Sequence, residues 1–87
     1  MSAKNPTPAE IGEYIRGRLA SAPGAYIAIE RARLAWYIRY ITSTGTMSAP
    51  IDRTAHKTEQ EARAAAAEMG LTVKTCGDFW QILPRLI

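Results

Sequence analysis

The most informative stretch of this sequence is residues 33–41, which read Arg-Leu-Ala-Trp-Tyr-Ile-Arg-Tyr-Ile. Side chains alternate between the two faces of a strand, so this stretch predicts a strand with one largely apolar face and one cationic face. The apolar face would carry Trp36, Ile38 and Tyr40, and the opposite face Arg33, Tyr37 and Arg39. We expect the first face to be buried and the second to be available to a partner.

Residues 25–34, just before this strand, fit two structures. Ile27 and Ile29 alternate as in a strand, whereas Ile27, Arg31 and Leu34 also fit one stripe of a helix. We favour the strand.

On the other side, Ser-Thr-Gly-Thr at residues 43–46 predicts a hairpin turn. A further strand is expected over about residues 47–55. Because proline cannot donate to a ladder, Pro50 would place this strand at a sheet edge or in a bulge.

Capping signals predict two helices. Thr-Pro-Ala-Glu at residues 7–10 combines an N-cap threonine, a proline at the first helical position and a glutamate three residues after the cap, which predicts a helix over 8–20. Thr-Glu-Gln-Glu at 58–61 opens an alanine-rich helix over 59–69 that ends at Gly70. The inward stripe of this second helix is Ala62, Ala65, Ala66 and Met69.

The C-terminal part predicts a strand over 71–76, a turn at 76–78 and a final strand over 79–83 that ends at Pro84. The element order is therefore α-β-β(-β)-α-β-β. This order predicts an α+β two-layer sandwich, in which two helices cover one face of a mostly antiparallel sheet of four or five strands. We expect one domain over residues 1–87, with residues 1–6 flexible.

Composition narrows the class of protein. Of the 87 residues, eleven are Lys or Arg and eight are Asp or Glu, for a net charge of +3. That balance favours partners with phosphate groups or acidic surfaces. A single cysteine excludes an intramolecular disulfide, and no apolar run is long enough for a signal peptide or a membrane span. We therefore expect a cytoplasmic protein that does not bind membranes.

The leading candidate site is the cationic strand face. Arginine pairs with phosphates or carboxylates, and a neighbouring aromatic ring can stack on a base or a guanidinium. An exposed strand face also carries charge simply to interact with water, and that alternative is equally open. The candidate partner-binding residues are Arg31, Arg33, Tyr37, Arg39 and Lys74.

A secondary candidate lies just before the second predicted helix. Arg53, His56 and Lys57 could hold an anion together with the helix N-terminus. Glu59 and Glu61 already answer the dipole of that helix, which favours the alternative that these residues only cap and solvate it.

No arrangement of residues predicts catalysis. Cys76 would need a base within reach, and the single histidine has no second histidine with which to hold a metal. The carboxylates belong to capped or solvated helix faces rather than to a pair with raised pKa values. We expect a non-enzyme without metal or cofactor.

Residues 36–83 resemble small phage and prophage accessory proteins. The likeness is carried by Trp-Tyr-Ile-Arg at 36–39, Thr-Glu-Gln-Glu-Ala-Arg at 58–63 and Trp-Gln-Ile at 80–82. In size and build the chain is similar to anti-CRISPR proteins. Because those proteins share no common fold, the resemblance implies only a mode of action, stoichiometric binding that blocks a nucleoprotein machine.

Two functions follow as hypotheses. The first is an inhibitor that docks on a protein or nucleoprotein complex with an acidic surface. The alternative is a protein that binds single-stranded nucleic acid directly on the Arg-Tyr-Arg sheet face. The oligomeric state does not follow from the sequence.

Overall fold

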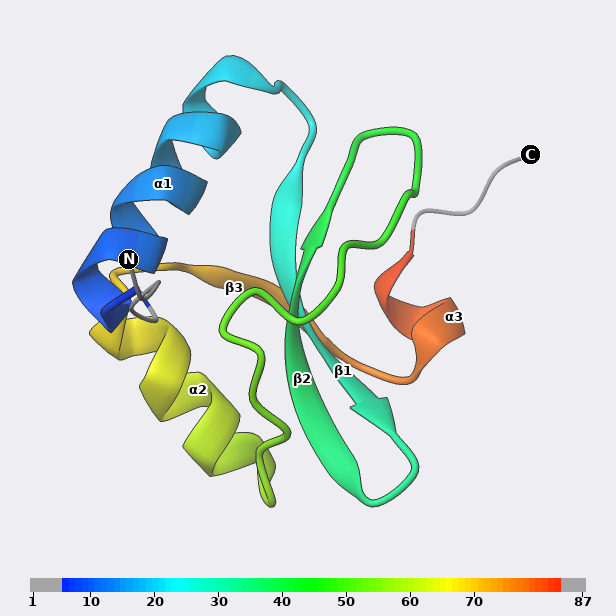
Figure 1. The fold of residues 1–87 in the computed structure, drawn as a ribbon. Coiled ribbons are helices and arrows are strands. Elements are labelled where there is room, and N and C mark those ends of the chain that lie inside the picture. The colour runs from blue at the N-terminus through cyan, green and yellow to red at the C-terminus, as the bar shows by residue number, and fades with distance from the viewer. Residues whose placement is uncertain (1–5, 84–87) are drawn as a thin grey trace.

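A computed structural model of the chain describes residues 6–83 (Figure 1). The elements in chain order are α1 (Pro8–Ser21), β1 (Tyr26–Ala32), β2 (Ala35–Ile41), α2 (Glu59–Glu68), β3 (Val73–Gly77) and α3 (Phe79–Ile82). The protein is thus a small α+β fold with three helices and three strands in the part of the chain that the structure describes. The flexible segment expected at residues 1–6 lies, apart from Pro6, outside the described residues.

Helix α1 begins at the predicted capping box. The Thr7 backbone N–H donates to Glu10 Oε1 at 2.9 Å, and the Glu10 backbone N–H donates to Thr7 Oγ1 at 3.2 Å. These two hydrogen bonds, the one from the Thr7 backbone first, lower the pKa of the Glu10 carboxyl. The sequence-based helix start is therefore confirmed.

Helix α2 also begins and ends at the predicted signals. Thr58 Oγ1 accepts the Glu61 backbone N–H at 3.0 Å, while the Glu61 carboxylate accepts the Lys57 N–H at 3.2 Å. At the other end Gly70 adopts φ +72°, and the N–H groups of Gly70 and Leu71 donate to carbonyls of the last helical turn. This left-handed glycine cap satisfies carbonyls that the helix leaves without partners.

The sheet has the strand order β2-β1-β3. β1 and β2 form an antiparallel hairpin in which Ile29 lies opposite Ile38. β3 runs parallel to β1, and its last residue, Gly77, lies opposite Glu30. The prediction of four or five mostly antiparallel strands is therefore wrong for the described residues, since the sheet is mixed and three-stranded. The preference for a strand over residues 25–34 is confirmed by β1.

The strand expected over residues 47–55 is an irregular segment beside the outer edge of β2. Ser48 N–H donates to the Tyr40 carbonyl and Ile51 N–H to the Ile38 carbonyl, both at 2.9 Å. His56 and Trp36 then exchange two backbone hydrogen bonds. Pro50 has no N–H to donate, so a continuous ladder cannot form, yet the segment still covers the edge of the sheet.

The strand expected over residues 79–83 is the short helix α3. Asp78 N–H donates to Gln81 Oε1 at 2.7 Å, and Ile82 N–H donates to the Asp78 carbonyl at 3.2 Å. The turn of helix buries Ile82, which is 1% exposed. The apolar run was read as a strand, but burial of one isoleucine against the sheet favours a helix here.

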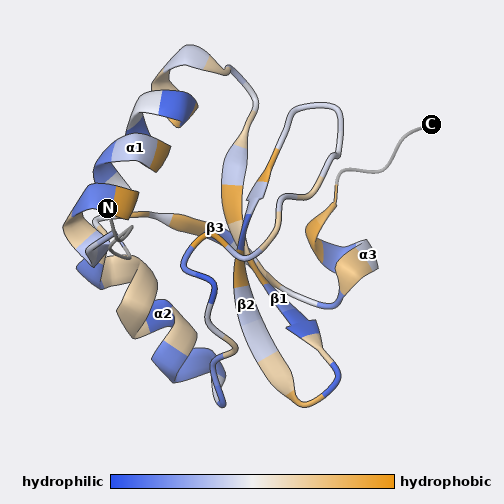
Figure 2. Cartoon of the chain, in the orientation of Figure 1, coloured by the Kyte–Doolittle hydropathy of each residue, from blue (hydrophilic) through white to orange (hydrophobic). Residues whose placement is uncertain are grey.

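Helices lie on both faces of the sheet rather than on one. Figure 1 shows α1 and α2 on one side of the strands and α3 on the other, and Figure 2 shows hydrophobic stretches of β1 and β2 between them. The main core, on the α1/α2 side, consists of Ile15, Ile27, Ile29, Ile38, Tyr40, Ala62, Ala66, Met69 and Leu71. A smaller cluster on the α3 side consists of Ala28, Ile41 and Ile82.

Helices α1 and α2 approach closely at Gly12. This glycine is buried, and a Cβ at its position would collide with the carbonyl oxygen of Met69. Arg16, one turn further along α1, donates from Nη1 to the same carbonyl at 2.6 Å. A guanidinium at the end of α2 also complements the negative end of its dipole. None of the helices in the described part of the chain has the length and apolar character needed to cross a membrane.

Candidate interaction surface

The alternation along β2 places its side chains as predicted. Ile38 and Tyr40 belong to the main core, and Trp36 packs against it. Tyr37 and Arg39 lie on the opposite face, which we call the far face because α1 and α2 do not cover it. Lys74 of β3 also lies there, since its neighbour Val73 packs against the main core.

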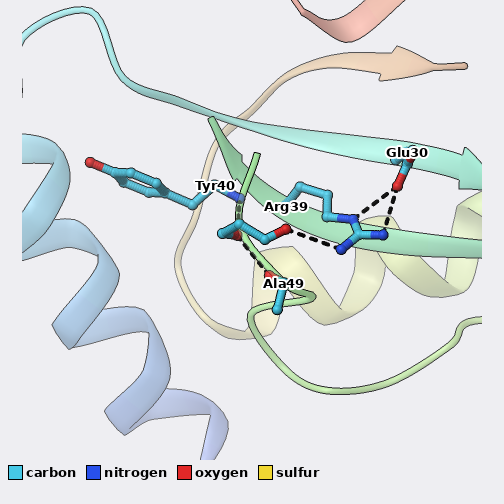
Figure 3. Close-up of polar contacts among 5 residues, drawn as sticks. Glu30, Arg39, Tyr40 and Ala49 are labelled. Atoms are coloured by element: carbon cyan, nitrogen blue, oxygen red, sulfur yellow. Dashed lines mark hydrogen bonds and ion pairs between the residues drawn. The ribbon is translucent and has the colours of Figure 1, made fainter. Parts of the chain in front are cut away.

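Arg39 is held by groups of the protein itself (Figure 3). Its guanidinium donates to Glu30 Oε1 from Nε at 2.9 Å and from Nη2 at 2.8 Å, and to the Ser48 carbonyl at 3.0 Å. The guanidinium also lies over the Tyr37 ring, 5.1 Å from its centroid. Glu30 is only 7% exposed. The charge of Arg39 therefore neutralises a buried carboxylate, and little of it remains for a partner.

Lys74 is stacked in a similar way. Its Nζ lies 4.7 Å from the centroid of the Tyr26 ring. The Tyr26 hydroxyl in turn donates to the Ile82 carbonyl of α3. The aliphatic stem of Lys74 thus lies against an aromatic ring while its ammonium group keeps contact with water.

Arg31 and Arg33 do not share the far face with Tyr37. Arg31 lies opposite Trp36 on the helix-covered side, with its guanidinium 5.9 Å from the centroid of that ring. Arg33 lies in the turn between β1 and β2 and has φ +57°. The expectation that Arg33 belongs to the strand face is wrong, because strand alternation does not continue through a turn with left-handed backbone.

A different surface brings exposed apolar and cationic side chains together at one end of the sheet. Because β1 and β3 are parallel, the β1–β2 turn and the start of α3 lie at the same end (Figure 1). Leu34 in the turn is 96% exposed, and Phe79 and Trp80 in α3 are 51% and 73% exposed. We call this surface the turn end; it consists of Arg31, Arg33, Leu34, Phe79 and Trp80.

Sequence reasoning missed most of the turn end because it placed residues 79–83 in a strand. The pattern Asp78-Phe79-Trp80-Gln81 contains the signal that would have found the helix, a capping aspartate followed three residues later by glutamine. A helical turn there buries Ile82 and directs both preceding aromatic rings to solvent.

The secondary candidates are separated by their contacts. His56 Nε2 lies 2.7 Å from Asp52 Oδ2, and both side chains are largely buried. Arg53 is exposed and has φ +56°. The first turn of α2 is already capped by Thr58 and by the contact of Glu61 with the Lys57 N–H. The residues therefore do not converge on one anion site at the start of α2.

Cys76 is a half-buried thiol that packs against the main core. Burial raises the pKa of this thiol, and the nearby Glu59 carboxylate raises it further. A thiol with a raised pKa stays protonated at neutral pH and is a weak nucleophile. Among residues 6–83, no group of three or more His, Cys, Asp or Glu side chains is arranged to hold a metal ion.

Comparison with family models, with curated proteins and with solved structures finds no match to this chain.

Proposed function

We propose that this chain is a small non-catalytic binding protein that docks on a protein or nucleoprotein complex and blocks it. The observation that carries the proposal is the turn end, where three large apolar side chains stand in solvent beside two arginines. Trp, Arg and Tyr dominate the residues that contribute most to binding energy in protein interfaces. An exposed leucine alone would mean little, but an exposed tryptophan and phenylalanine on the same end of the sheet are typical of a contact surface.

The partner proposed for the turn end presents apolar pockets beside acidic groups. Arg31 and Arg33 are both exposed, and neither has a carboxylate partner among the described residues. Two guanidiniums at the rim of an apolar patch favour a complementary surface with carboxylates or phosphates. This differs from the strand-face site expected from the sequence, in which Arg39 and Lys74 would have supplied the charge.

Blocking by occupation suits a chain of this size. The resemblance to anti-CRISPR proteins implies the same mode of action, in which a small protein covers a working surface of a nucleoprotein machine. We propose that the protein acts in this way in a bacterial cytoplasm, with one copy occupying one surface of its target.

A second candidate function is direct binding of single-stranded nucleic acid, and it rests on the same surface. Phe79 and Trp80 are exposed rings on which bases could stack, and the two arginines could pair with phosphates. Such binding would weaken steeply as salt rises, because counterions are released from the phosphates. A well-packed protein interface responds less to salt.

The test is capture by the tagged protein from a lysate that contains an active CRISPR–Cas complex, in nuclease-treated and untreated halves. Trp80→Ala is compared with Tyr14→Ala, a matched control because Tyr14 is 63% exposed but lies on α1. If Trp80 anchors the interface, its removal should weaken binding by about 30-fold, the equivalent of about 2 kcal/mol. A plaque assay in cells with the same CRISPR–Cas system then measures whether binding blocks interference.

Recovery of one complex in both halves, lost with Trp80→Ala and kept with Tyr14→Ala, supports the inhibitor. Recovery only without nuclease, together with nucleic acid, supports the second candidate instead. Equal recovery with both variants shows that the turn end is not the contact surface. Both substituted side chains are exposed, so stability should change by less than about 0.5 kcal/mol in either variant.

A further inference from the structure

A cleft of about 580 Å³ lies between α1 and the irregular segment that covers the edge of β2. It lies on the helix-covered side of the sheet, and no turn-end residue lines it. Its floor is apolar and consists of Ile11, Ile15, Tyr40 and Ile51. Ile15 and Tyr40 also belong to the main core, so this floor is rigid rather than a loose loop surface. Clefts of this volume with a mostly apolar lining are typical of small-ligand sites.

One end of the cleft is cationic. The Arg18 guanidinium lies over two rings, 5.9 Å from the Tyr14 centroid and 5.3 Å from the Tyr40 centroid. Arg18 Nη1 also donates to the Tyr14 hydroxyl at 3.2 Å. The two rings hold the guanidinium at the cleft while most of its N–H donors remain open to a ligand, which is the arrangement that a carboxylate requires.

The other end has mixed charge. Glu10 is the one carboxylate among the described residues that line the cleft, and Arg53 lines the cleft as well. The Glu10 carboxylate accepts the Thr7 N–H, which partly satisfies it. Eight residues of helix separate Glu10 from Arg18, or about 12 Å along the axis. An anion at Arg18 would therefore be well separated from the carboxylate.

The hydroxyl groups that line the cleft are occupied by the protein. Thr42 Oγ1 accepts the Thr46 N–H and contacts the Thr44 hydroxyl, and Ser48 Oγ accepts the Tyr40 N–H and donates to the Ala49 carbonyl. A bound peptide would bring several amide groups that need hydrogen-bond partners here. An alkyl chain brings none, so the lining favours an aliphatic ligand over a peptide.

We propose that this cleft binds an unbranched aliphatic carboxylate, with the carboxylate on Arg18 and the chain along the floor from Ile15 to Ile11. From Arg18 to Ile11 the helix rises about 10 Å. With C–C bonds near 1.5 Å, an extended chain of about eight to ten carbons covers that distance. The ligand class is a medium-chain fatty acid.

The experiment titrates the full chain with decanoate below its micelle concentration, by calorimetry and by NMR of the backbone amides. Decanol is the matched ligand without the charge. Arg18→Gln removes the cation at the cleft, and Arg63→Gln removes an equal charge from α2, where Arg63 contacts only the exposed Glu59. Ala49→Trp, at an exposed position in the lining, fills the cleft while leaving Arg18 in place.

We expect decanoate to shift the amides of residues 11, 15 and 51 and to bind more tightly than decanol. Arg18→Gln should weaken decanoate binding about tenfold or more, the range for a charge-assisted hydrogen bond. Arg63→Gln should leave it unchanged, and Ala49→Trp should abolish it.

Several results overturn the proposal. They are equal binding of decanol, equal weakening by Arg18→Gln and Arg63→Gln, full binding to Ala49→Trp, and shifts confined to the turn end. Binding of an apolar peptide carboxylate in the cleft without binding of decanoate also overturns it. The test uses no macromolecular partner, so its result is independent of the proposed docking function.

Discussion

The two faces of the sheet are built in different ways. On the side of α1 and α2 the buried strand side chains are isoleucines and a tyrosine, and no charged residue belongs to the core there. On the far face the buried apolar cluster is small, and beside it lies a carboxylate, Glu30, paired with Arg39. The difference follows from the cover, since two helices seal one face and the four-residue α3 covers part of the other.

This contrast shows what a strand face needs in order to bury a charge. Glu30 loses most of its contact with water, so it requires a partner of opposite charge and full hydrogen bonding. Arg39 supplies two N–H contacts to it and stacks on Tyr37. A strand pattern that displays arginine can therefore be an internal support rather than a binding surface.

The largest effect should come from the helix-covered face. Ile38→Ala removes a fully buried side chain from the main core, and Ile41→Ala makes the same change in the small cluster of the far face. Loss of the Ile38 side chain should cost about 4 kcal/mol because the core between sheet and helices cannot collapse around the cavity. Loss of the Ile41 side chain should cost about 2 kcal/mol, since the short α3 and its neighbours can adjust. Urea denaturation measures both, and equal losses would show that the two faces are equally well packed.

The ion pair should give the next largest effect. Arg39→Met leaves the Glu30 carboxylate buried without its cation and should cost about 3 kcal/mol of unfolding free energy. Replacing both members, by Glu30→Leu with Arg39→Met, should restore stability to within about 1 kcal/mol of the original protein, because no unpaired charge remains. A small loss in the single variant would mean that water already screens Glu30, and the contrast between the two faces would then disappear.

The contact between α1 and α2 provides a smaller effect with an internal control. Gly12→Ala should cost about 2 kcal/mol, because its methyl group has to displace the Met69 carbonyl and with it the Arg16 contact. Gly17→Ala lies on the same helix with open space around it and should stabilise the protein by about 0.5–1 kcal/mol through helix propensity. Thermal denaturation distinguishes the two variants by the sign of the shift. A neutral result at Gly12 would show that the helices are not in close contact.

The elements that local signals define were predicted well. The capped starts of α1 and α2, the glycine that ends α2 and the alternation along β2 depend on residues within a few positions of one another. The strand count, the parallel β1–β3 pair and helix α3 were not predicted. Each of these depends on which distant segment covers a strand edge or a strand face, and periodicity carries no information about that choice.

The candidate site shows the same limit at the level of single residues. The sequence placed Tyr37, Arg39 and Lys74 on the far face, where they lie. It could not show that Arg39 is occupied by Glu30, since Glu30 lies nine positions earlier and meets Arg39 only through the hairpin register. It also could not place Leu34 beside the start of α3, because that neighbourhood depends on the parallel pairing of β3 with β1.

By itself the sequence determined where helices start and stop, which face of β2 is buried and the net charge of +3. These features follow from backbone hydrogen bonding, from the two-residue period of a strand and from composition, all of which are local. Only the tertiary structure decided which arginines are paired, which aromatic rings face solvent and where a cleft opens beside α1. The reason is that exposure and ion pairing depend on contacts between segments far apart in the chain.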